Sequence, residues 1–219
     1  MNCYLCDQEM RHEPTWRSLF FRDIAETACP ACKAEFCRVP TACCGICGLP
    51  GDQLCRDCSE WELTEFAGLV RSGKSLYVYN EAMKTYLHQY KFLHDVILSE
   101  VFASDINEAL RHSDATLVPI PMNAEKLKKR TFSQVDELLR SAGLPYTHLL
   151  SKTDQVQGKK NRQERLESAR LFEWNGSEIP TNIILIDDLY ATGTTMRHAA
   201  KELKGAGAGE IELFTLIRA

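Results

Sequence analysis

The stretch NIILIDDLYATGTT, residues 182–195, predicts more about the fold than any other part of this sequence. Residues 183–186 are four consecutive apolar residues, which is typical of a strand buried on both faces, and the acids Asp187 and Asp188 come at its end. Gly193 lies among threonines in the segment that follows, which predicts a loop leading into a helix. A strand, a polar loop and a helix in this order are typical of a parallel α/β sheet.

The same stretch has the chemistry of a sugar-phosphate site. Two adjacent acids point to opposite sides of a strand, so they can accept hydrogen bonds from the vicinal hydroxyls of a ribose or approach Mg²⁺. Gly193 lets the backbone come close to a ligand, while threonine hydroxyls and the free N–H groups of a helix start favour an anion. The alternative is that Asp188 and Thr194 only cap the following helix.

Strands and helices alternate on both sides of this stretch. Short runs of β-branched, aromatic and other apolar residues predict further strands at 75–80, 115–121, 147–152 and 210–218. Apolar positions three and four apart predict helices at 59–70, 81–92, 95–111, 133–143 and 194–205, and the charged segment 158–169 is a loop or a helix. The order predicts an α/β fold with a mostly parallel sheet flanked by helices, in which ligands bind beyond the carboxyl ends of the strands.

All ten cysteines lie between Cys3 and Cys58, so we expect a cysteine-rich domain at residues 1–62 and an α/β domain at residues 63–219. Eight of the cysteines form four CxxC pairs, Cys3/Cys6, Cys29/Cys32, Cys44/Cys47 and Cys55/Cys58. Two such pairs complete a tetrahedral site suited to structural Zn²⁺, and joining neighbours along the chain predicts a double zinc ribbon. An iron–sulfur cluster is the alternative. Cys37 and Cys43 are left over, and Cys43 adjoins Cys44, so either of these two can be the ligand.

The charge and hydropathy of the chain limit its partners. A formal net charge of −4 argues against a protein that coats nucleic acid by bulk electrostatics. Basic residues cluster at 124–130 and 159–165, and solvated helix faces are the plainer interpretation of such clusters. No apolar run approaches the roughly 18 residues of a membrane helix, and the N-terminus has no features of a secretion signal, so we expect a cytoplasmic protein.

The apolar strand, the Asp-Asp pair and the Ala-Thr-Gly-Thr-Thr loop together resemble the phosphoribosyl-pyrophosphate motif of type I phosphoribosyltransferases. Nearly the whole chain resembles the ComF family of late competence proteins, in which cysteine knuckles precede a phosphoribosyltransferase-like domain. The segments that carry this resemblance are YKF at 90–92 with Asp95, LVPIPM at 117–122, KRTFSQVDELL at 129–139 and KTDQVQGKKNRQER at 152–165. Arg130, Phe132 and Gln134 match the family, whereas Thr131 stands where glycine is usual and Ser133 where asparagine is usual.

The resemblance implies a binding site for 5-phosphoribosyl-1-pyrophosphate with Mg²⁺. Its residues are Asp187, Asp188, Ala191, Thr192, Gly193, Thr194 and Thr195. If the protein is an enzyme, Asp187 and Asp188 are catalytic candidates together with Lys91, which would contact pyrophosphate; the alternative for Lys91 is an ordinary surface lysine. Arg162 and Arg165 are candidates for a mobile lid over the leaving group, with a charged helix face as the alternative.

The resemblance also implies a role in natural transformation, in which the protein acts with the ComFA translocase ATPase while single-stranded DNA enters the cytoplasm. The zinc ribbons would then dock ComFA or DNA. The candidates for contacts to DNA phosphates are Lys128, Lys129, Arg130, Lys159, Lys160, Arg162 and Arg165. The alternative function is an active phosphoribosyltransferase of nucleotide metabolism, for which the sequence shows no base-specific segment. We expect Trp16, Trp61 and Trp174 to be core or interface residues, and the protein to be a monomer or one copy in a hetero-complex.

Overall fold

The computed structural model describes residues 1–10, 26–153 and 171–219. Its helices are α2 (Pro30–Ala34), α3 (Arg56–Trp61), α4 (Glu81–Phe92), the 3₁₀ helix η1 (Val96–Phe102), α5 (Ala103–Leu110), α6 (Ala124–Arg130), α7 (Gln134–Ser141) and α9 (Thr194–Gly205). Its strands are β1 (Ser72–Val78), β2 (Thr116–Pro119), β3 (Leu150–Lys152), β4 (Phe172–Trp174), β5 (Asn182–Tyr190) and β6 (Glu210–Arg218).

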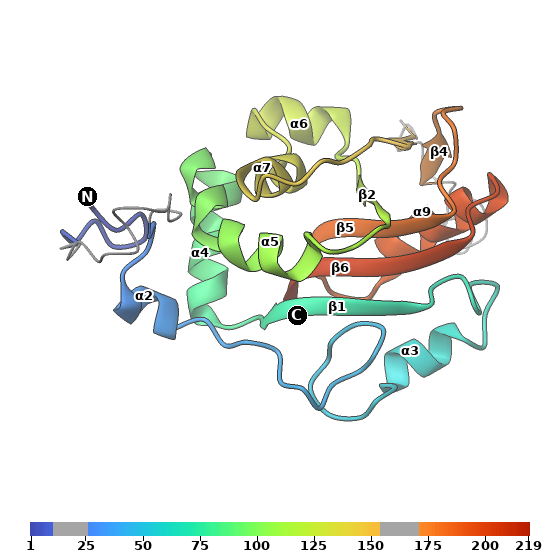
Figure 1. Ribbon diagram of the computed structural model, residues 1–219, viewed down its shortest axis with the longest axis horizontal. Coiled ribbons are helices and arrows are strands. Elements are labelled where there is room, and N and C mark those ends of the chain that lie inside the picture. Colours follow the sequence, from blue (N-terminus) through green and yellow to red (C-terminus); the bar gives the residue numbers. More distant parts are fainter. Residues whose placement is uncertain (11–25, 154–170) are drawn as a thin grey trace, which may run out of the picture.

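A four-stranded parallel sheet with the order β1-β6-β5-β2 forms the centre of the fold (Figure 1). β6 lies between β1 and β5 and pairs with both, and β2 pairs with the other edge of β5. The pairing of Pro119 with Ile186 brings the end of β2 beside the residue before Asp187. All four carboxyl ends therefore meet at one edge, where the predicted site lies, and the predicted α/β fold is confirmed.

Each face of the sheet packs against its own hydrophobic core, because alternate strand residues point to opposite sides. Ile184 and Ile186 of β5 pack with buried residues of α4, η1, α5 and α7. Ile183 and Leu185 pack on the opposite side with α9 and with the cysteines of the third and fourth CxxC pairs, Cys44/Cys47 and Cys55/Cys58. The latter cysteines thus belong to the core of the α/β fold.

The helices α4 and α9 position the candidate site on the two faces. The side chain of Asn80 caps α4 by accepting a hydrogen bond from Met83 N (2.9 Å), and the buried residues of α4 recur three and four positions apart. This register places Lys91 in the last turn, at the carboxyl edge of the sheet. On the other face, the buried Ala199 and Ala200 let α9 lie close to β5.

Several predicted elements differ from the observed ones. The strand predicted at 147–152 does not join the parallel sheet, since β3 pairs antiparallel with β4 in a separate two-stranded sheet. The first half of the helix predicted at 95–111 is the 3₁₀ helix η1, and the helix predicted at 59–70 ends at Trp61. The basic segment 124–130 forms the additional helix α6. The charged segment predicted as a loop or helix at 158–169 lies outside the described residues.

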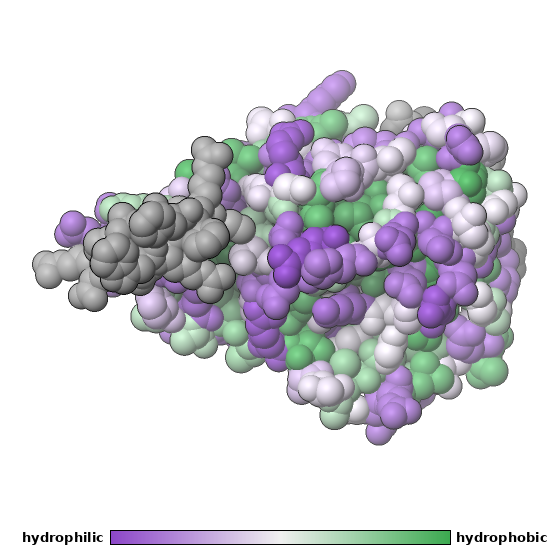
Figure 2. Space-filling view, in the orientation of Figure 1, coloured by the Kyte–Doolittle hydropathy of each residue, from purple (hydrophilic) through white to green (hydrophobic). Residues whose placement is uncertain are grey.

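The surface and the ends of the molecule show where the cysteine-rich segments lie. The first two CxxC pairs, Cys3/Cys6 and Cys29/Cys32, lie at the end of the molecule opposite α9 (Figure 1). The face seen in Figure 2 mixes hydrophilic and hydrophobic residues. Within the described part of the chain, no helix has both the length and the apolar character needed to span a membrane.

Candidate functional site

A cleft of about 220 Å³ lies at the carboxyl edge of the sheet. Its charged lining residues come from four separate elements and include both signs. They are Lys91 of α4, Lys126 and Arg130 of α6, Lys152 of β3, and Asp187 and Asp188 of β5. Thr195, in the first turn of α9, also lines the cleft. The structure therefore brings together four predicted residues, Lys91, Asp187, Asp188 and Thr195, with Lys126 and Lys152, which were not among the predicted ligand-binding residues.

The two acids lie on opposite faces of β5, as alternation along a strand requires. The prediction that the strand ends at these acids is wrong, because β5 continues to Tyr190 in register with β6. Its pairing partner at that point is Arg218, which is buried. The strand residues before and after the two acids both pair with β6, so the acids lie within the sheet and not in a loop after it.

Asp188 points to the face covered by α4, where its Oδ2 forms an ion pair with Lys91 Nζ. The exposed fractions of the two side chains are 13% for Lys91 and 12% for Asp188, so little water screens the pair. Lys91 is thus held at the sheet edge by an acid, and its predicted contact with pyrophosphate stays a prediction.

Asp187 points to the other face, towards Lys152 of β3. Burial and the neighbouring Asp188 carboxylate raise the pKa of Asp187 to about 7, although the amide of Asp188 and the cations Lys91 and Lys152 act in the opposite direction. The amide contact is the hydrogen bond from Asp188 N to Asp187 Oδ1 (2.8 Å). At neutral pH this carboxyl is therefore near its midpoint, and it can either donate to or accept from a hydroxyl of a ligand.

The loop after β5 begins α9 with Gly193 as its N-terminal cap, at a φ of 78°. A Cβ at this position would lie 2.1 Å from Tyr190 Oη and 2.3 Å from Arg197 Nη1, so glycine is required for space as well as for conformation. Among the described residues, no protein acceptor is found for the N–H groups of Gly193, Thr194 and Thr195. Amides at a helix start, together with the helix dipole, favour an anion.

The remaining motif residues lie near the cleft without lining it. Ala191 and Thr192 form the turn between β5 and α9, and the Thr192 and Thr194 hydroxyls are hydrogen-bonded to each other at 3.0 Å. Thr192 faces a neighbouring cleft together with Trp61. The contribution of Ala191, Thr192 and Thr194 to ligand binding therefore rests on backbone groups and stays a prediction.

Thr131, at the position where the resembled family has glycine, follows α6 with a φ of 65°. This left-handed conformation is easy for glycine and strained for a β-branched residue. The preceding Arg130 and following Gln134 are joined by a hydrogen bond from Arg130 Nη1 to Gln134 Oε1 (3.0 Å), and both line the cleft. The turn at Thr131 thus sets where Arg130 enters the cleft.

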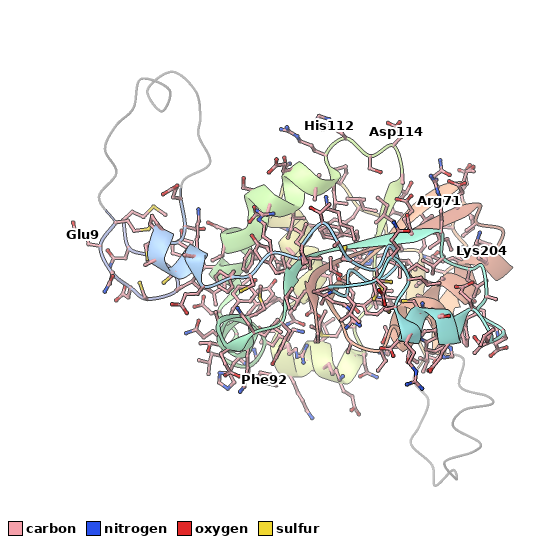
Figure 3. All side chains as sticks on the ribbon, turned by 90° about the horizontal axis from the view of Figure 1, so that it is seen from below. Glu9, Arg71, Phe92, His112, Asp114 and Lys204 are labelled. Carbon is pink, nitrogen blue, oxygen red and sulfur yellow. The ribbon has the colours of Figure 1, made fainter. Side chains whose placement is uncertain are left out.

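The predicted DNA-contacting residues fall into three groups. Lys128 and Lys129 are exposed on α6 and do not line the cleft. Arg130 is partly buried, with its guanidinium 5.6 Å from the ring centroid of Phe92, an exposed side chain at the end of α4 (Figure 3). Four predicted residues lie outside the described part of the chain, Lys159, Lys160, Arg162 and Arg165.

The cysteines form two clusters with the predicted pairing. The first contains Cys3, Cys6, Cys29 and Cys32, and the second Cys44, Cys47, Cys55 and Cys58, with all four sulfurs of each within 4.8 Å of one another. A tetrahedron with Zn–S bonds of about 2.3 Å has S–S edges of roughly 3.8 Å. The measured separations of 3.9 Å for Cys6–Cys29 and 3.6 Å for Cys47–Cys55 match those edges. Both clusters fit structural Zn²⁺, with Cys44 and not Cys43 in the second.

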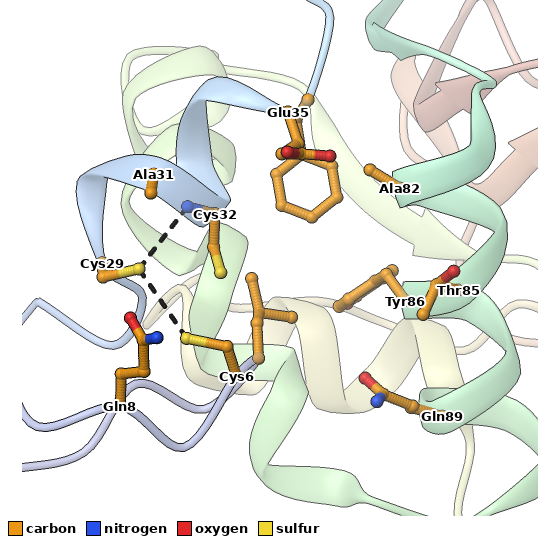
Figure 4. A pocket seen from close by; sticks show the side chains of 12 residues that line it. Cys6, Gln8, Cys29, Ala31, Cys32, Glu35, Ala82, Thr85, Tyr86 and Gln89 are labelled. Carbon is orange, nitrogen blue, oxygen red and sulfur yellow. Dashed lines mark hydrogen bonds between the residues drawn. The ribbon is translucent and has the colours of Figure 1, made fainter.

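The first cluster lies against α4. A cleft of about 390 Å³ separates its cysteines from the outer face of that helix, as Figure 4 shows with Cys6, Cys29 and Cys32 opposite Ala82, Tyr86 and Gln89. Cys6 is exposed, whereas Cys3 is buried. This cluster is therefore a surface feature at the side of the α/β fold.

The second cluster is completely buried, and one of its sulfurs contacts the buried Arg197. Arg197 Nη2 donates to Cys58 Sγ at 3.6 Å. A hydrogen bond from Cys58 lowers the pKa of the Cys47 thiol to about 4, with further contributions from the Leu49 amide and from Arg218, against the effect of burial. Burial and the Cys47 thiolate raise the pKa values of Cys55 and Cys58, so among these three cysteines only Cys47 is shifted towards thiolate, the form that binds a metal.

Residues that sequence reasoning missed connect this cluster to the loop after β5. Trp61 Nε1 donates to Thr192 O (3.0 Å), and Arg218 Nη1 donates to Ala191 O (3.2 Å). The predicted core or interface role of Trp61 did not indicate this contact. The only signals in the sequence were the short distance from Cys58 to Trp61 and the presence of Arg218 at the end of a buried strand.

Comparisons with known proteins show which family this chain resembles. Residues 89–219 match the family model described as "Phosphoribosyl transferase domain". The chain is similar to "Competence protein ComFC" of Bacillus subtilis (strain 168), with 36% identity over 99% of this chain and 94% of the other. It is equally similar to "Competence protein ComFC" of Streptococcus pneumoniae (strain ATCC BAA-255 / R6), with 36% identity over 100% of both chains. "Competence protein F" of Haemophilus influenzae (strain ATCC 51907 / DSM 11121 / KW20 / Rd) is 24% identical over 87% of this chain and 90% of the other.

Proposed function

This chain belongs to the ComFC family of competence proteins, and we propose that it acts in natural transformation while binding 5-phosphoribosyl-1-pyrophosphate at the carboxyl edge of its sheet. Similarity over nearly the full length of curated competence proteins supports the first part of this proposal. The composition of the cleft supports the second.

The observation that carries the ligand proposal is the meeting of Asp187 and Asp188 with four cations in one cleft. A phosphoribosyl pyrophosphate carries vicinal hydroxyls, which donate to carboxylates, and phosphates, which need cations and N–H donors. Lys126, Arg130 and Lys152 supply further cations to the cleft, and the start of α9 supplies N–H groups that have no acceptor among the described residues. Each chemical part of the ligand therefore has a matching group.

Mg²⁺ enters this proposal as the ion that accompanies pyrophosphate. Carboxylate oxygens are ligands that Mg²⁺ prefers, so Asp187 and Asp188 are the residues that would hold it, and it would neutralise phosphate charge there. The remaining contributions come from the chain itself. Thr195 and the α9 amides orient a phosphate, and the paired acids fix the ribose.

Thermal unfolding with and without ligand tests the binding proposal. We expect phosphoribosyl pyrophosphate with Mg²⁺ to raise the unfolding midpoint of the wild type, since a ligand that binds only the folded state stabilises it by mass action. Ribose 5-phosphate and inorganic pyrophosphate should each give smaller shifts. Lys126→Met should reduce the shift, whereas Lys74→Met, an exposed lysine of β1 outside this cleft, should not. No shift for the wild type at millimolar ligand would refute the binding site.

The alternative is an active phosphoribosyltransferase, and the family match to a phosphoribosyl transferase domain favours testing it. The reaction would displace pyrophosphate from the anomeric carbon by a nitrogen nucleophile. Pyrophosphate release in the presence of purine or pyrimidine bases, absent without them and absent for Asp187→Asn/Asp188→Asn, would establish the transferase. Binding without release would leave a ligand-sensing role in DNA uptake.

We further propose that the protein works in the cytoplasm with the ComFA translocase ATPase and contacts single-stranded DNA through the exposed face of α6. The last turn of α6 is wholly basic, and Lys128 and Lys129 make no contact with the cleft. Such a surface suits phosphate contacts to a flexible strand.

In this proposal the metal-binding residues 1–62 dock the translocase and residues 63–219 bind the ligand. The first cluster is the part of this region that lies at the surface, with Cys6 exposed, whereas the second is buried in the core. Pull-down of ComFA by the wild type and by Cys6→Ser/Cys32→Ser tests the docking role. Retained capture by the variant would place the docking surface elsewhere.

A further inference from the structure

Two buried arginines lie between the second cysteine cluster and the loop that follows β5. Arg197 is 1% exposed and Arg218 is 3% exposed. No carboxylate in the described part of the chain pairs with either of them, and Arg218 Nε there has no hydrogen-bond partner. A buried guanidinium without a counter-charge is costly, so a compensating anion is expected nearby.

The second cysteine cluster supplies that negative charge. Arg197 Nη2 lies 3.6 Å from Cys58 Sγ. Arg218 Cζ lies 5.1 Å from the ring centroid of Tyr190, whose Oη is 3.9 Å from the same sulfur. Four thiolates around one Zn²⁺ carry a net charge of −2, which two guanidinium groups balance. The arginines therefore suit the metal-bound state of this cluster.

The same arginines also contact residues 190–193, which lead from the end of β5 into α9. Arg197 Nη1 donates to Tyr190 Oη, and it occupies the space that a Cβ at Gly193 would enter. Arg218 Nη1 donates to Tyr190 O at 3.3 Å and to Ala191 O at 3.2 Å. Trp61, three residues after Cys58, donates to Thr192 O and stacks on Arg197, whose Cζ is 4.9 Å from its ring centroid. Every residue from 190 to 193 thus touches a group anchored at the second cluster.

We propose that Arg197, Arg218 and Trp61 are positioning residues through which the metal-bound second cluster holds residues 190–193 in their ligand-binding conformation. Loss of metal from this cluster leaves two buried cations unbalanced, and the loop that they support loses its shape. The consequence for ligand affinity rests on the proposed function, whereas the consequence for the loop itself does not.

The first cluster is an internal control for this coupling. It lies at the opposite end of the molecule from α9, as the positions of Glu9 and Lys204 in Figure 3 show. Its neighbours are α4 and Glu100, and within the described residues it makes no hydrogen bond to residues 190–195. Both clusters have the same ligand set, so removing either metal changes composition equally.

The experiment compares Cys55→Ser with Cys6→Ser in the full chain. Cys55 belongs to the second cluster but makes no hydrogen bond to Arg197, Arg218 or Trp61. Zinc content is measured by elemental mass spectrometry, and hydrogen exchange of the residue 197 amide, bonded to Gly193 O at 3.0 Å, reports on the loop without ligand. Calorimetry with phosphoribosyl pyrophosphate and Mg²⁺ gives the Kd.

Both variants should lose one zinc. Cys6→Ser should keep the wild-type exchange rate and a Kd within about twofold of the wild-type value. Cys55→Ser should raise both the exchange rate and the Kd at least tenfold. Equal effects of the two variants would overturn the coupling. The two proposals can fail separately. If the wild type binds no ligand, but the residue 197 amide exchanges faster in Cys55→Ser and not in Cys6→Ser, the proposed function is refuted and the coupling stands.

If Cys55→Ser does not fold, Arg197→Met decides the question, because its metal ligands are intact. We expect faster loop exchange and weaker ligand binding in Arg197→Met, with partial recovery in Arg197→Lys. Leu139→Ala, a fully buried residue of the opposite core, controls for general destabilisation and should leave the Kd unchanged. Wild-type loop exchange in Arg197→Met would overturn the proposal.

Discussion

Lys91 in the last turn of α4 and Asp188 in β5 form an ion pair that is almost shielded from solvent. The pair joins the helix that covers one face of the sheet to the strand that carries both acids. Removing one partner leaves a charge without compensation, and this effect dominates the energetics of the site.

Lys91→Met should lower the free energy of unfolding by about 2–4 kcal/mol, because Asp188 then stays buried without a counter-charge. Lys91→Met/Asp188→Asn should recover most of that loss. Urea denaturation measures both. Lys84→Met, which breaks an exposed ion pair with Glu81 on the same helix, should cost less than about 0.5 kcal/mol. Similar losses for Lys84→Met and Lys91→Met would contradict the buried pair.

Asp187→Asn should stabilise the protein at alkaline pH. The folded-state pKa of about 7 exceeds the unfolded value of about 3.9, so wild-type stability falls as pH rises from about 4 to 7, and the penalty is complete above 7. The partly exposed position of Asp187 reduces the full effect, and we expect a gain of about 1–3 kcal/mol at pH 8. The gain should vanish near pH 4. Unfolding midpoints across this range test it, and a constant gain at all pH values would argue against the raised pKa.

Gly193→Ala should abolish ligand binding and destabilise the protein more than Gly143→Ala does. Both glycines have positive φ, 78° and 67°, but a Cβ meets Tyr190 and Arg197 only at Gly193 and nothing within 4 Å at Gly143. The strain alone costs about 1–2 kcal/mol. Denaturation and calorimetry of the two variants separate strain from the clash. Equal stability losses would show that the loop adjusts freely.

Thr131→Gly should stabilise the protein by about 0.5–1 kcal/mol, because it removes a β-branched side chain from a left-handed turn, less the entropy cost of glycine. Ser133→Gly, at a φ of −81°, should destabilise instead. Thermal unfolding of the two variants gives the comparison. A loss of stability in both would mean that the Thr131 hydroxyl contributes more than its backbone strain costs.

Lys128→Glu/Lys129→Glu should weaken binding to single-stranded oligonucleotides. The slope of log K against the logarithm of salt concentration should become shallower by roughly 1–1.5, as expected for two lost phosphate contacts. Lys74→Glu/Arg111→Glu changes the net charge equally at exposed positions on β1 and after α5. Fluorescence anisotropy at several salt concentrations distinguishes the pairs. If both variants bind with the same affinity, binding depends on net charge and not on α6.

The sequence was informative where one physical requirement fixed the residue pattern. The apolar residues 183–186 predicted a doubly buried strand, and the spacing of four CxxC pairs predicted both sulfur clusters. Asp187 and Asp188 both line the cleft because they follow the buried strand residues at the carboxyl edge of the sheet, one on each face of β5.

The parts that sequence reasoning missed depend on contacts between distant segments. Arg197 looked like one polar residue of an amphipathic helix, yet it is fully buried because Cys58, Tyr190 and Trp61 surround it. Lys152 enters the cleft because β3 pairs with β4 outside the main sheet, which no local pattern revealed. The continuation of β5 beyond the acids likewise depends on its pairing with β6.

The place of β6 between β1 and β5 has a consequence for biosynthesis. Of the four strands in the sheet, β6 is the last that the ribosome makes, and within the described sheet β1 has no other partner. Residues 37–39 can bond to β1 early, through the Arg38–Tyr77 bridge, but the edge of β1 that pairs with β6 must wait through the translation of residues 79–209. Nascent chains of this protein close their sheet late, and until then they expose two strand edges to chaperones and to each other.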